Sequence, residues 1–489
     1  DTLKDEAHQV NTNNNYRDTL LDDNNTSNAD HLDCENPQQQ LNVYSSNSEL
    51  SSSEESEIND LEKSNIENLS CLERYFGPVR AGSLRGSTIA MASITFGGGC
   101  LSFPYAIAQS GPIIGLIIFV IIGIFSYWTL YILMINGLES RTMDYNNLIV
   151  LAMGNFWRIV ADLANMVLCF GLLVSYQYII STLCLQVLNE FWDTSCEGTT
   201  KIIQIVICAV TIQIPLSCLK NIAQLQYLSI SGTIALCIST IVIICEFPVY
   251  LKQYIDNGKS IELFPSSEDL KWGWVDTVGI FLFGFSSHNG IFQIFDELKR
   301  PGKRRCKKVL NRAFYLEFVL YILLSFTGFF STLYDTPDVF LKRKNLDSFE
   351  NDYIIIVVKI LLVITLNSCM AMNYNILRQS YNSMFFNSEQ PIFWKDFLLV
   401  LVTYILSNFV TYILPNAGTL LSFLGGLTAV YICFVVPFMV DININKERKP
   451  FSRKIFNYVS LVVICLIGGL CSVKSLIDFI DSDTPDPVC

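Results

Sequence analysis

Two stretches of this chain place glycines and small polar residues inside otherwise apolar sequence. The first, SITFGGGCLSFPYA, spans residues 93–106 and contains Gly97, Gly98, Gly99 and Pro104. Each glycine lowers helix stability by roughly 1 kcal/mol, and the proline removes a backbone hydrogen-bond donor. Within a bilayer, unwound backbone is tolerated only beside a cavity or inside protein. If this stretch crosses a membrane, we therefore expect a broken helix whose free backbone groups can bind a ligand.

The second stretch, FLFGFSSHNGIFQIFDELKRP, is equally unfavourable for a continuous helix. Its centre consists of Gly284, Phe285, Ser286, Ser287, His288, Asn289 and Gly290. A single interruption could be explained by close packing of helices alone. Two interruptions at corresponding positions of two halves instead indicate a transporter binding site. There, the N-terminus of a half-helix would face a substrate carboxylate, and exposed carbonyls would face an amino group or a cation.

The composition indicates that membrane-spanning helices hold both stretches. The 489 residues are 51% hydrophobic and only 16% charged, whereas soluble domains carry about 25% charged residues. No charged side chain occurs between Gly86 and Leu138, which leaves room for two spans of about 20 residues. We predict eleven spans, near residues 86–110, 112–136, 159–187, 202–219, 225–250, 274–294, 313–334, 353–377, 396–414, 417–440 and 456–479. The two glycine-containing stretches then fall in spans 1 and 6, which correspond if spans 1–5 and 6–10 are inverted repeats.

Basic residues, which favour the cytoplasmic side, predict the orientation of these spans. Eight basic residues and no acidic one lie in residues 299–312, and five more basic residues lie in 446–454. Both loops share a face if the count is eleven, so we expect a cytosolic N-terminus and a C-terminus outside or in a lumen. Lys342, Arg343 and Lys344 fall on the opposite face as a minor exception. The membrane is either vacuolar or lysosomal in type or the plasma membrane; the absence of N-x-S/T sequons in residues 81–489 favours an internal compartment.

The first 80 residues differ in composition from the rest. They contain 5 basic and 17 acidic residues, which accounts for the whole net charge of −12. Because they are rich in Asn and Ser, they cannot bury enough apolar surface to fold. We expect a disordered acidic cytosolic tail over residues 1–80 and a transmembrane transporter domain over residues 81–489. The tail is either simply solvated or regulated by phosphorylation in SSSEESE, and its partners are left open.

Three motifs resemble the amino acid/auxin permease family, especially its sodium-coupled neutral amino acid transporters and vacuolar amino acid transporters. GGGCLSFPYA is similar to the family's G-S-G-I-L-G-L-P-Y-A, and IPLSCLKNIAQLQYLS is similar to L-P-L-S-L-L-R-N-L-x-x-L. GFSSHNGIFQIFDELKRPGKRR is similar to F-x-F-x-C-H-P-x-V-L-P-I-Y-x-E-L-K followed by basic residues. The resemblance implies an all-α polytopic fold of eleven helices. In that fold a five-plus-five inverted repeat, with helices 1 and 6 broken, moves amino acids by alternating access.

The resemblance also implies which residues bind substrate. The backbone of residues 97–99 would meet the substrate's backbone groups, and Phe285 and Ser286 would meet its amino group. Tyr176, in VSYQY of span 3, corresponds to a family tyrosine that flanks the site. A purely packing role would explain this aromatic residue equally well.

The coupling ion is where the sequence departs from that family. Ser93 stands where the sodium-coupled members have asparagine, and in LNSCMA, Asn367 and Cys369 replace their two threonines. A thiol is a poor partner for a hard cation, which prefers oxygen, although Asn367 or Ser368 could supply that oxygen. A proton-driven or passive mechanism is therefore favoured over sodium coupling. His288, the only histidine of the predicted membrane domain, is counted among the substrate-binding residues of the second stretch. It is also a candidate proton carrier or a structural residue.

Four acidic residues lie near predicted span ends, where placement at the interface costs less than burial. We expect each of them to reach the interface or to form an ion pair; they are Asp162, Glu246, Asp276 and Glu317.

Other functional classes fit the sequence less well. An enzyme is disfavoured because no H-E-x-x-H, G-x-S-x-G or phosphate-binding loop occurs, and three histidines leave little for metal chemistry. We expect no metal site, no cofactor other than a coupling proton or sodium ion, and no nucleic-acid partner. A nutrient sensor that signals through the tail would use the same site, and a channel fits paired half-helices less well. We therefore predict a secondary active transporter of neutral or aromatic amino acids in a lipid bilayer.

Overall fold

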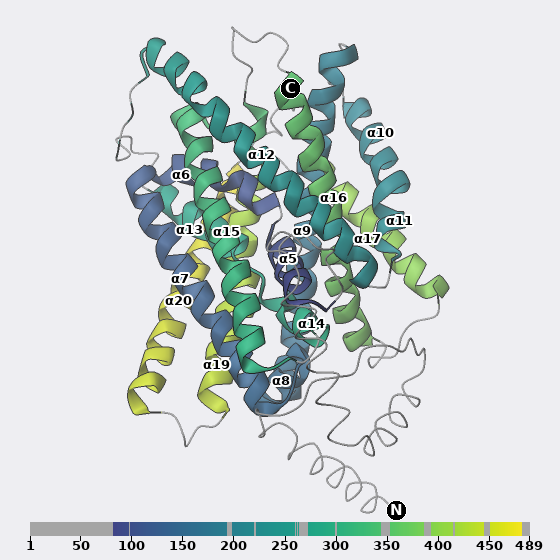
Figure 1. Cartoon of the computed structure of the whole chain (residues 1–489), viewed down its shortest axis with the longest axis vertical. Helices are drawn as coiled ribbons and strands as arrows, with labels where there is room; N and C mark the ends of the chain where they lie inside the picture. The colour runs from purple at the N-terminus through teal and green to yellow at the C-terminus, as the bar shows by residue number, and fades with distance from the viewer. Residues whose placement is uncertain are drawn as a thin grey trace, which may run out of the picture. The chain divides into compact units, whose positions relative to one another are not determined.

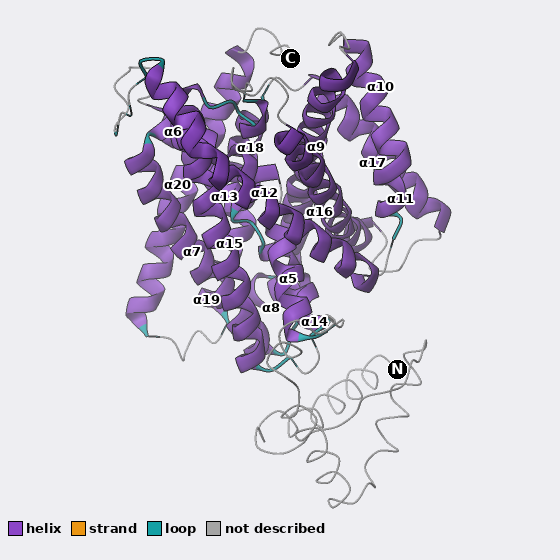
Figure 2. Ribbon diagram, turned by 45° about the horizontal axis from the view of Figure 1, so that its top comes forward, coloured by secondary structure: helices purple, strands orange, loops and turns teal. Residues whose placement is uncertain are grey.

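The computed structural model describes residues 82–96, 98–192, 198–219, 222–259, 261, 263, 272–298, 301–343, 353–385, 393–413, 416–444 and 450–481. Within these ranges the regular elements are all helical (Figure 2). Residues from Arg80 to Cys489 group into one compact unit. The predicted tail of residues 1–80 lies outside the described residues.

Nine helices in the described ranges are long and apolar enough to cross a membrane. Seven of these are continuous: α7 (Pro112–Ser140), α9 (Asn155–Trp192), α12 (Ile222–Asp256), α15 (Lys303–Thr332), α16 (Tyr353–Phe385), α17 (Phe393–Ile413) and α20 (Phe451–Asp481). An eighth joins α18 (Ala417–Leu424) to α19 (Val436–Asn443) through two π-helical turns. The ninth contains α13 (Gly273–Gly284) and α14 (Ile291–Asp296). The chain is therefore an all-helical, multi-pass membrane protein.

Two further segments complete the comparison with the predicted spans. The pair α5 (Leu84–Thr95) and α6 (Phe103–Ser110) forms a tenth crossing if the two helices, bent by 50° at their junction, are taken together. Predicted span 4 is a shorter apolar helix over Ile203–Ser217, formed by α10 (Gly198–Cys208), a π turn and α11 (Ile214–Ser217). Eleven crossings therefore stay a prediction.

The two interrupted helices lie at the centre of the bundle. Figure 1 shows α5 surrounded by α9, α12, α15 and α16, and α5 and α6 pack against α15 and α13 respectively. In the hydrophobic window of Gly273–Asp296, 94% of residues are buried, compared with 17% for Phe451–Asp481 of α20. Since α20 exposes apolar side chains such as Val462 and Leu466, it suits contact with lipid, whereas the interrupted helices are enclosed by protein, as unwound backbone in a bilayer requires.

Both helices are interrupted at the stretches that the sequence singles out. After α5 ends at Thr95, a 3-10 turn over Gly98–Ser102 leads into α6. After α13 ends at Gly284, residues 285–287 leave the helix and a second 3-10 turn, His288–Gly290, leads into α14. The interruptions face each other, because a Cβ on Gly99 would lie 3.3 Å from the Cα of Gly284.

Two expectations about charged residues need correction. Glu317 was expected near the end of a span starting at residue 313, but α15 begins at Lys303 and places Glu317 at its middle, with 3% of the residue exposed. The apolar window began only after the basic cluster, whereas the helix itself extends through that cluster. Asp162 is also buried, and it accepts hydrogen bonds of 2.8 Å from Asn146 and from Ser383. By contrast Asp276 and Glu246 form the expected ion pairs, with Lys474 and Arg343.

Two of the three basic residues on the unexpected face have local partners, and Lys344 lies outside the described residues. Lys342 forms an ion pair of 2.8 Å with Asp338 and donates to the hydroxyl of Tyr178 at 2.7 Å. Arg343 is buried, pairs with Glu246 and lies over the ring of Tyr250. Neighbouring carboxylates and aromatic rings bind both cations. Lys342 and Arg343 therefore carry little information about which face of the membrane is cytosolic.

Candidate functional site

A narrow pocket separates the two interruptions. Residues from α5, the turn after it, α9 and the end of α13 line the pocket: Ile94, Thr95, Gly99, Leu172, Tyr176, Phe283, Gly284 and Ser286. None of these eight side chains carries a charge. The pocket has room for at most about one water molecule, so the structure is closed around this point.

Side chains from two neighbouring helices satisfy carbonyl groups that the interruptions leave open. A helix end leaves up to about four carbonyls without an intrahelical partner. The hydroxyl of Tyr321 on α15 donates to the carbonyl of Thr95 at 2.6 Å and lies 3.4 Å from that of Gly284. Ser126 on α7 donates to the carbonyl of Phe285 at 3.0 Å. Tyr321 therefore joins the ends of both interrupted helices.

The N-terminus of a helix lies at the opposite end of the first interruption. α6 begins at Phe103, directly after the 3-10 turn, and the side chain of its N-cap residue, Ser102, makes no capping hydrogen bond. The N-terminus of a helix carries a partial positive charge. The interruptions thus combine the carbonyl ends of α5 and α13 with the N-terminus of α6, a combination that suits the amino and carboxylate groups of an amino acid.

The structure brings together some of the predicted substrate residues and separates others. Gly99, Tyr176 and Ser286 all line the pocket. Gly97 lies outside the described residues, and Gly98 begins the 3-10 turn. Phe285 does not line the pocket: it is buried in an aromatic cluster, 6.2 Å from Phe103, 5.3 Å from Phe119 and 5.5 Å from Tyr321 between ring centroids.

His288 lies outside the pocket lining, on the α7 side of the second interruption. Its ring is fully buried, and Nε2 lies 2.8 Å from the hydroxyl oxygen of Thr129 on α7. Nδ1 has no hydrogen-bond partner among the described residues. The hydroxyl of Thr129 also lies 3.0 Å from the carbonyl of Ser126, so the histidine is part of the contact that holds the second interruption against α7.

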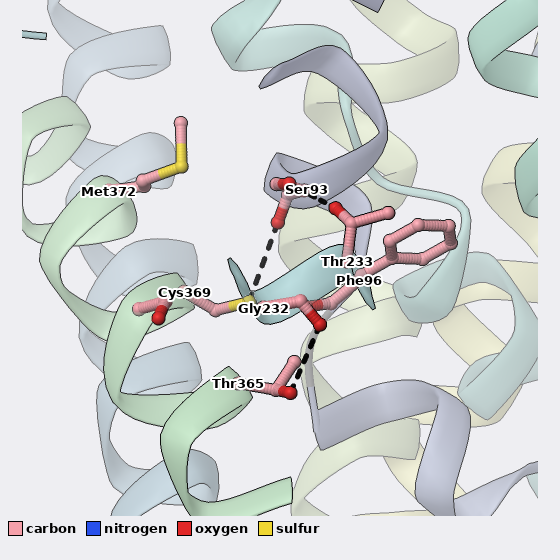
Figure 3. Close-up of a pocket in the computed structure, with 8 residues that line it drawn as sticks. Ser93, Phe96, Gly232, Thr233, Thr365, Cys369 and Met372 are labelled. Atoms are coloured by element: carbon pink, nitrogen blue, oxygen red, sulfur yellow. Dashed lines mark hydrogen bonds between the residues drawn. The ribbon is translucent and has the colours of Figure 1, made fainter. Parts of the chain in front are cut away.

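A second pocket lies between α5, α12 and α16 (Figure 3). It is lined by Ser93, Phe96, Gly232, Thr233, Thr365, Ser368, Cys369 and Met372. The hydroxyl groups of Ser93 and Thr233 lie 2.7 Å apart, and Thr365 donates to the carbonyl of Gly232 at 3.1 Å. The thiol of Cys369 donates to the carbonyl of Ser93 at 3.5 Å and also to that of Phe96.

Three of the four predicted coupling residues meet at this second pocket. Ser93, Ser368 and Cys369 line it, whereas Asn367 does not. The amide of Asn367 donates to the carbonyl of Val363 in its own helix at 2.7 Å. The thiol of Cys369 engages two carbonyl oxygens beside this pocket, and hydroxyl groups are the other oxygen atoms of its lining side chains. Among the described residues, no group of three or more His, Cys, Asp and Glu side chains could hold a metal ion.

The sequence did not identify the residues of neighbouring helices that form hydrogen bonds with the two interruptions. Tyr321 and Ser126 lie in helices that show no unusual motif, so nothing in the sequence distinguishes them from packing residues. Glu317 did carry a signal, because an acidic residue within an apolar helix is rare and usually functional. The apolar window from residue 313 hides this signal because it places Glu317 near a span end, whereas α15 begins at Lys303.

Comparisons with known proteins agree with this architecture. A family model described as transmembrane amino acid transporter protein matches residues 80–480. Sodium-coupled neutral amino acid symporter 2 of Danio rerio is 21% identical over 412 residues, which cover 80% of this chain and 80% of that protein.

Two solved structures share the fold at low sequence identity. The crystal structure of MhsT in complex with L-phenylalanine matches with a TM-score of 0.52 and 12% identity, over 80% of this chain and 97% of that chain. The manganese transporter of Eremococcus coleocola matches with a TM-score of 0.51 and 10% identity, over 82% of this chain and 88% of that chain. Because one structure binds an amino acid and the other is described as a manganese transporter, the fold alone does not identify the substrate.

Proposed function

Because the chain belongs to the transmembrane amino acid transporter family, we propose that it is a secondary active transporter of neutral or aromatic amino acids. The observation that carries this proposal is the pocket between the two interruptions, whose uncharged lining includes Thr95 and Gly284, the last residues of α5 and α13. The relatives are transporters and not enzymes. A small-molecule substrate and surrounding lipid follow from that membership.

The pocket supports substrates without a charged side chain. The aliphatic and aromatic side chains of Ile94, Leu172 and Phe283 form much of its wall, together with Tyr176. A charged substrate side chain there would lose its hydration without gaining an ionic partner. The substrate's ammonium group would bind near the carbonyls of Thr95 and Gly284, and its carboxylate would bind at the turn formed by residues 98–102.

Alternating access would follow from the closed state of the pocket. An amino acid is larger than the space between the interruptions, so the helices around the pocket must separate before substrate can enter or leave. We propose that the two interruptions act as hinges, each opening the pocket to one side of the membrane. This arrangement corresponds to eleven crossings with two inverted repeats, a cytosolic N-terminus, and a C-terminus outside or in a lumen.

We propose that protons, and not sodium ions, drive uptake. The family resemblance assigns a sodium site to the region of Ser93 and Cys369, but there the thiol of Cys369 donates to the carbonyls of Ser93 and Phe96. A thiol is a poor ligand for a hard cation. The membrane in which this transport occurs, vacuolar or lysosomal in type or plasma membrane, stays open.

The test is uptake of a labelled mixture of neutral and aromatic L-amino acids into liposomes that contain the full chain. A pH gradient and a sodium gradient are imposed in separate experiments, with empty liposomes as the control. We expect accumulation with the pH gradient alone. Binding of amino acids without any flux would contradict the proposal and would favour the alternative, a nutrient sensor that signals through residues 1–80.

A further inference from the structure

The carboxyl group of Glu317 is enclosed at the middle of α15 without a cationic partner. The residue is 3% exposed, and no Lys or Arg of the described segments forms an ion pair with it. The side chain of Thr95, the last residue of α5, lies beside it. Oε1 has no hydrogen-bond partner among the described residues.

The surroundings of Glu317 favour a neutral carboxyl group in this closed structure. A threonine hydroxyl has one hydrogen to donate, and that of Thr95 is donated to the carbonyl of Met91 at 3.2 Å. Among the described residues, no Lys or Arg supplies a counter-charge and Oε1 has no hydrogen-bond donor. An ionised carboxylate in the same place would be buried without a counter-charge, at a high cost in free energy.

No other charged group competes for this role around the carboxyl group. The titratable side chains that face it are Cys100, from the turn after α5, and Tyr321, one turn further along α15. Beyond them lie Tyr176 of α9 and Cys369 of α16, which face Tyr321. α6, α7 and α12 also pack against α15, and none of their described residues adds a charged group that interacts with Glu317.

We propose that Glu317 is the proton-binding residue whose protonation allows the first interruption to close. The inference rests on the proposed transport function and names the group that carries its driving ion. Tyr321 binds the carbonyl of Thr95 at the end of α5, and the carboxyl group of Glu317 lies beside the Thr95 side chain. When α5 moves away from α15 to open the pocket, water reaches the carboxyl group.

One proton moves with each substrate because α5 closes over the bound amino acid only when Glu317 is protonated, whereas the empty transporter, with water in the vacant pocket, returns with Glu317 ionised. On the side of higher proton concentration, the carboxylate of Glu317 takes up one proton from water, and α5 closes over the bound amino acid. On the other side, α5 opens, the O–H bond of the carboxyl group breaks, and the proton passes to water. No electron is transferred, and no group other than the proton changes its covalent partner.

Accumulation in liposomes with the membrane potential held at zero tests this role. A pH difference of one unit can drive accumulation of at most about tenfold if one proton moves with each substrate. We expect the wild-type chain to approach that ratio and Glu317→Gln to stay near a ratio of one. Because the amide preserves the shape and the neutrality of the protonated carboxyl group, Glu317→Gln should still exchange labelled for unlabelled substrate at equal pH. Asp256→Asn, at the exposed end of α12, is the matched control and should accumulate like wild type.

Accumulation by Glu317→Gln at the wild-type ratio would overturn the assignment. If Glu317→Gln loses exchange as well, Glu317→Asp decides, because it retains a titratable carboxyl group. pH-driven accumulation by Glu317→Asp supports the proposal, and a ratio near one contradicts it. Wild-type uptake that only equilibrates, or that responds only to sodium, overturns the proton site and leaves transport intact. The absence of any wild-type flux overturns the transport proposal itself.

Discussion

The hydroxyl of Tyr321 donates a hydrogen bond of 2.6 Å to the carbonyl oxygen of Thr95, the last residue of the first half-helix. The same hydroxyl lies 3.4 Å from the carbonyl of Gly284, the last residue of α13. One side chain of α15 thus supports both interruptions. The ring of Tyr321 also packs edge-on against Phe96 and Phe103, at centroid distances of 5.8 and 4.9 Å.

Replacing Tyr321 by phenylalanine should weaken this junction without creating a cavity. The buried carbonyl of Thr95 would lose its partner, at a cost of about 1–3 kcal/mol in the free energy of unfolding. We expect a lower melting temperature in detergent and slower uptake. Tyr315→Phe, on the same helix but 72% exposed, is the control; equal effects of both variants would show that the bond to Thr95 does not matter.

Gly284 should not tolerate a side chain. A Cβ at this position would lie 2.2 Å from Cζ of Phe103, whose ring is fully buried between Phe281 and Tyr321. Because that ring has no free space to move into, Gly284→Ala should destabilise the chain by about 1–3 kcal/mol and reduce uptake. Thermal unfolding and uptake assays measure both effects.

Gly469 provides the comparison for this substitution. It lies inside α20, and a Cβ there would meet nothing within 4 Å. Gly469→Ala should leave uptake unchanged and should stabilise the helix by up to about 1 kcal/mol. An uptake loss in Gly469→Ala equal to that of Gly284→Ala would point to a general sensitivity of the chain to glycine replacement.

Uptake should not change when choline replaces sodium, because the thiol of Cys369 is a poor ligand for a hard cation. Cys369→Ser retains a donor for the carbonyls of Ser93 and Phe96, so we expect uptake close to wild type. Cys369→Ala leaves these buried carbonyls without that donor and should destabilise the chain by about 1–3 kcal/mol. Sodium-dependent uptake by the wild-type chain would contradict this account of the second pocket.

The pair formed by Arg343 and Glu246 should be strongly coupled. The Arg343 side chain is 2% exposed and also lies over the rings of Tyr250 and Phe340. Removing either partner leaves a poorly solvated charge, with an expected loss of about 3–5 kcal/mol in the free energy of unfolding. The double variant Glu246→Gln with Arg343→Met should lose less than the sum of the single variants. Additive losses in this double-mutant cycle would indicate that the two charges act independently.

The positions of the two interruptions could be predicted from sequence because glycine, proline and small polar residues act locally. Residues 97–99 and 284–290 disfavour a helix wherever they lie along a membrane-spanning segment, and apolar composition alone indicated that such segments exist. Gly99 and Ser286 of the pocket lie within these two stretches, and Tyr176 was predicted from the family resemblance. The chain's membership of a transporter family follows from the same local patterns.

Contacts between distant helices could not be predicted in this way. Phe285 and His288 lie in the second interrupted stretch, yet their side chains are directed into an aromatic cluster and toward Thr129, because α7 and α15 occupy those sides. Asn367 is adjacent to Ser368 and Cys369 in sequence, but at about 100° per residue a helix turns it out of their pocket. Tyr321 and Glu317 matter because α15 packs against the end of α5, and the residue types alone do not specify that contact. The sequence by itself determined where the helices are interrupted, and tertiary packing alone decided which side chains hold the interruptions together, since hydrogen bonds and burial depend on which helices become neighbours.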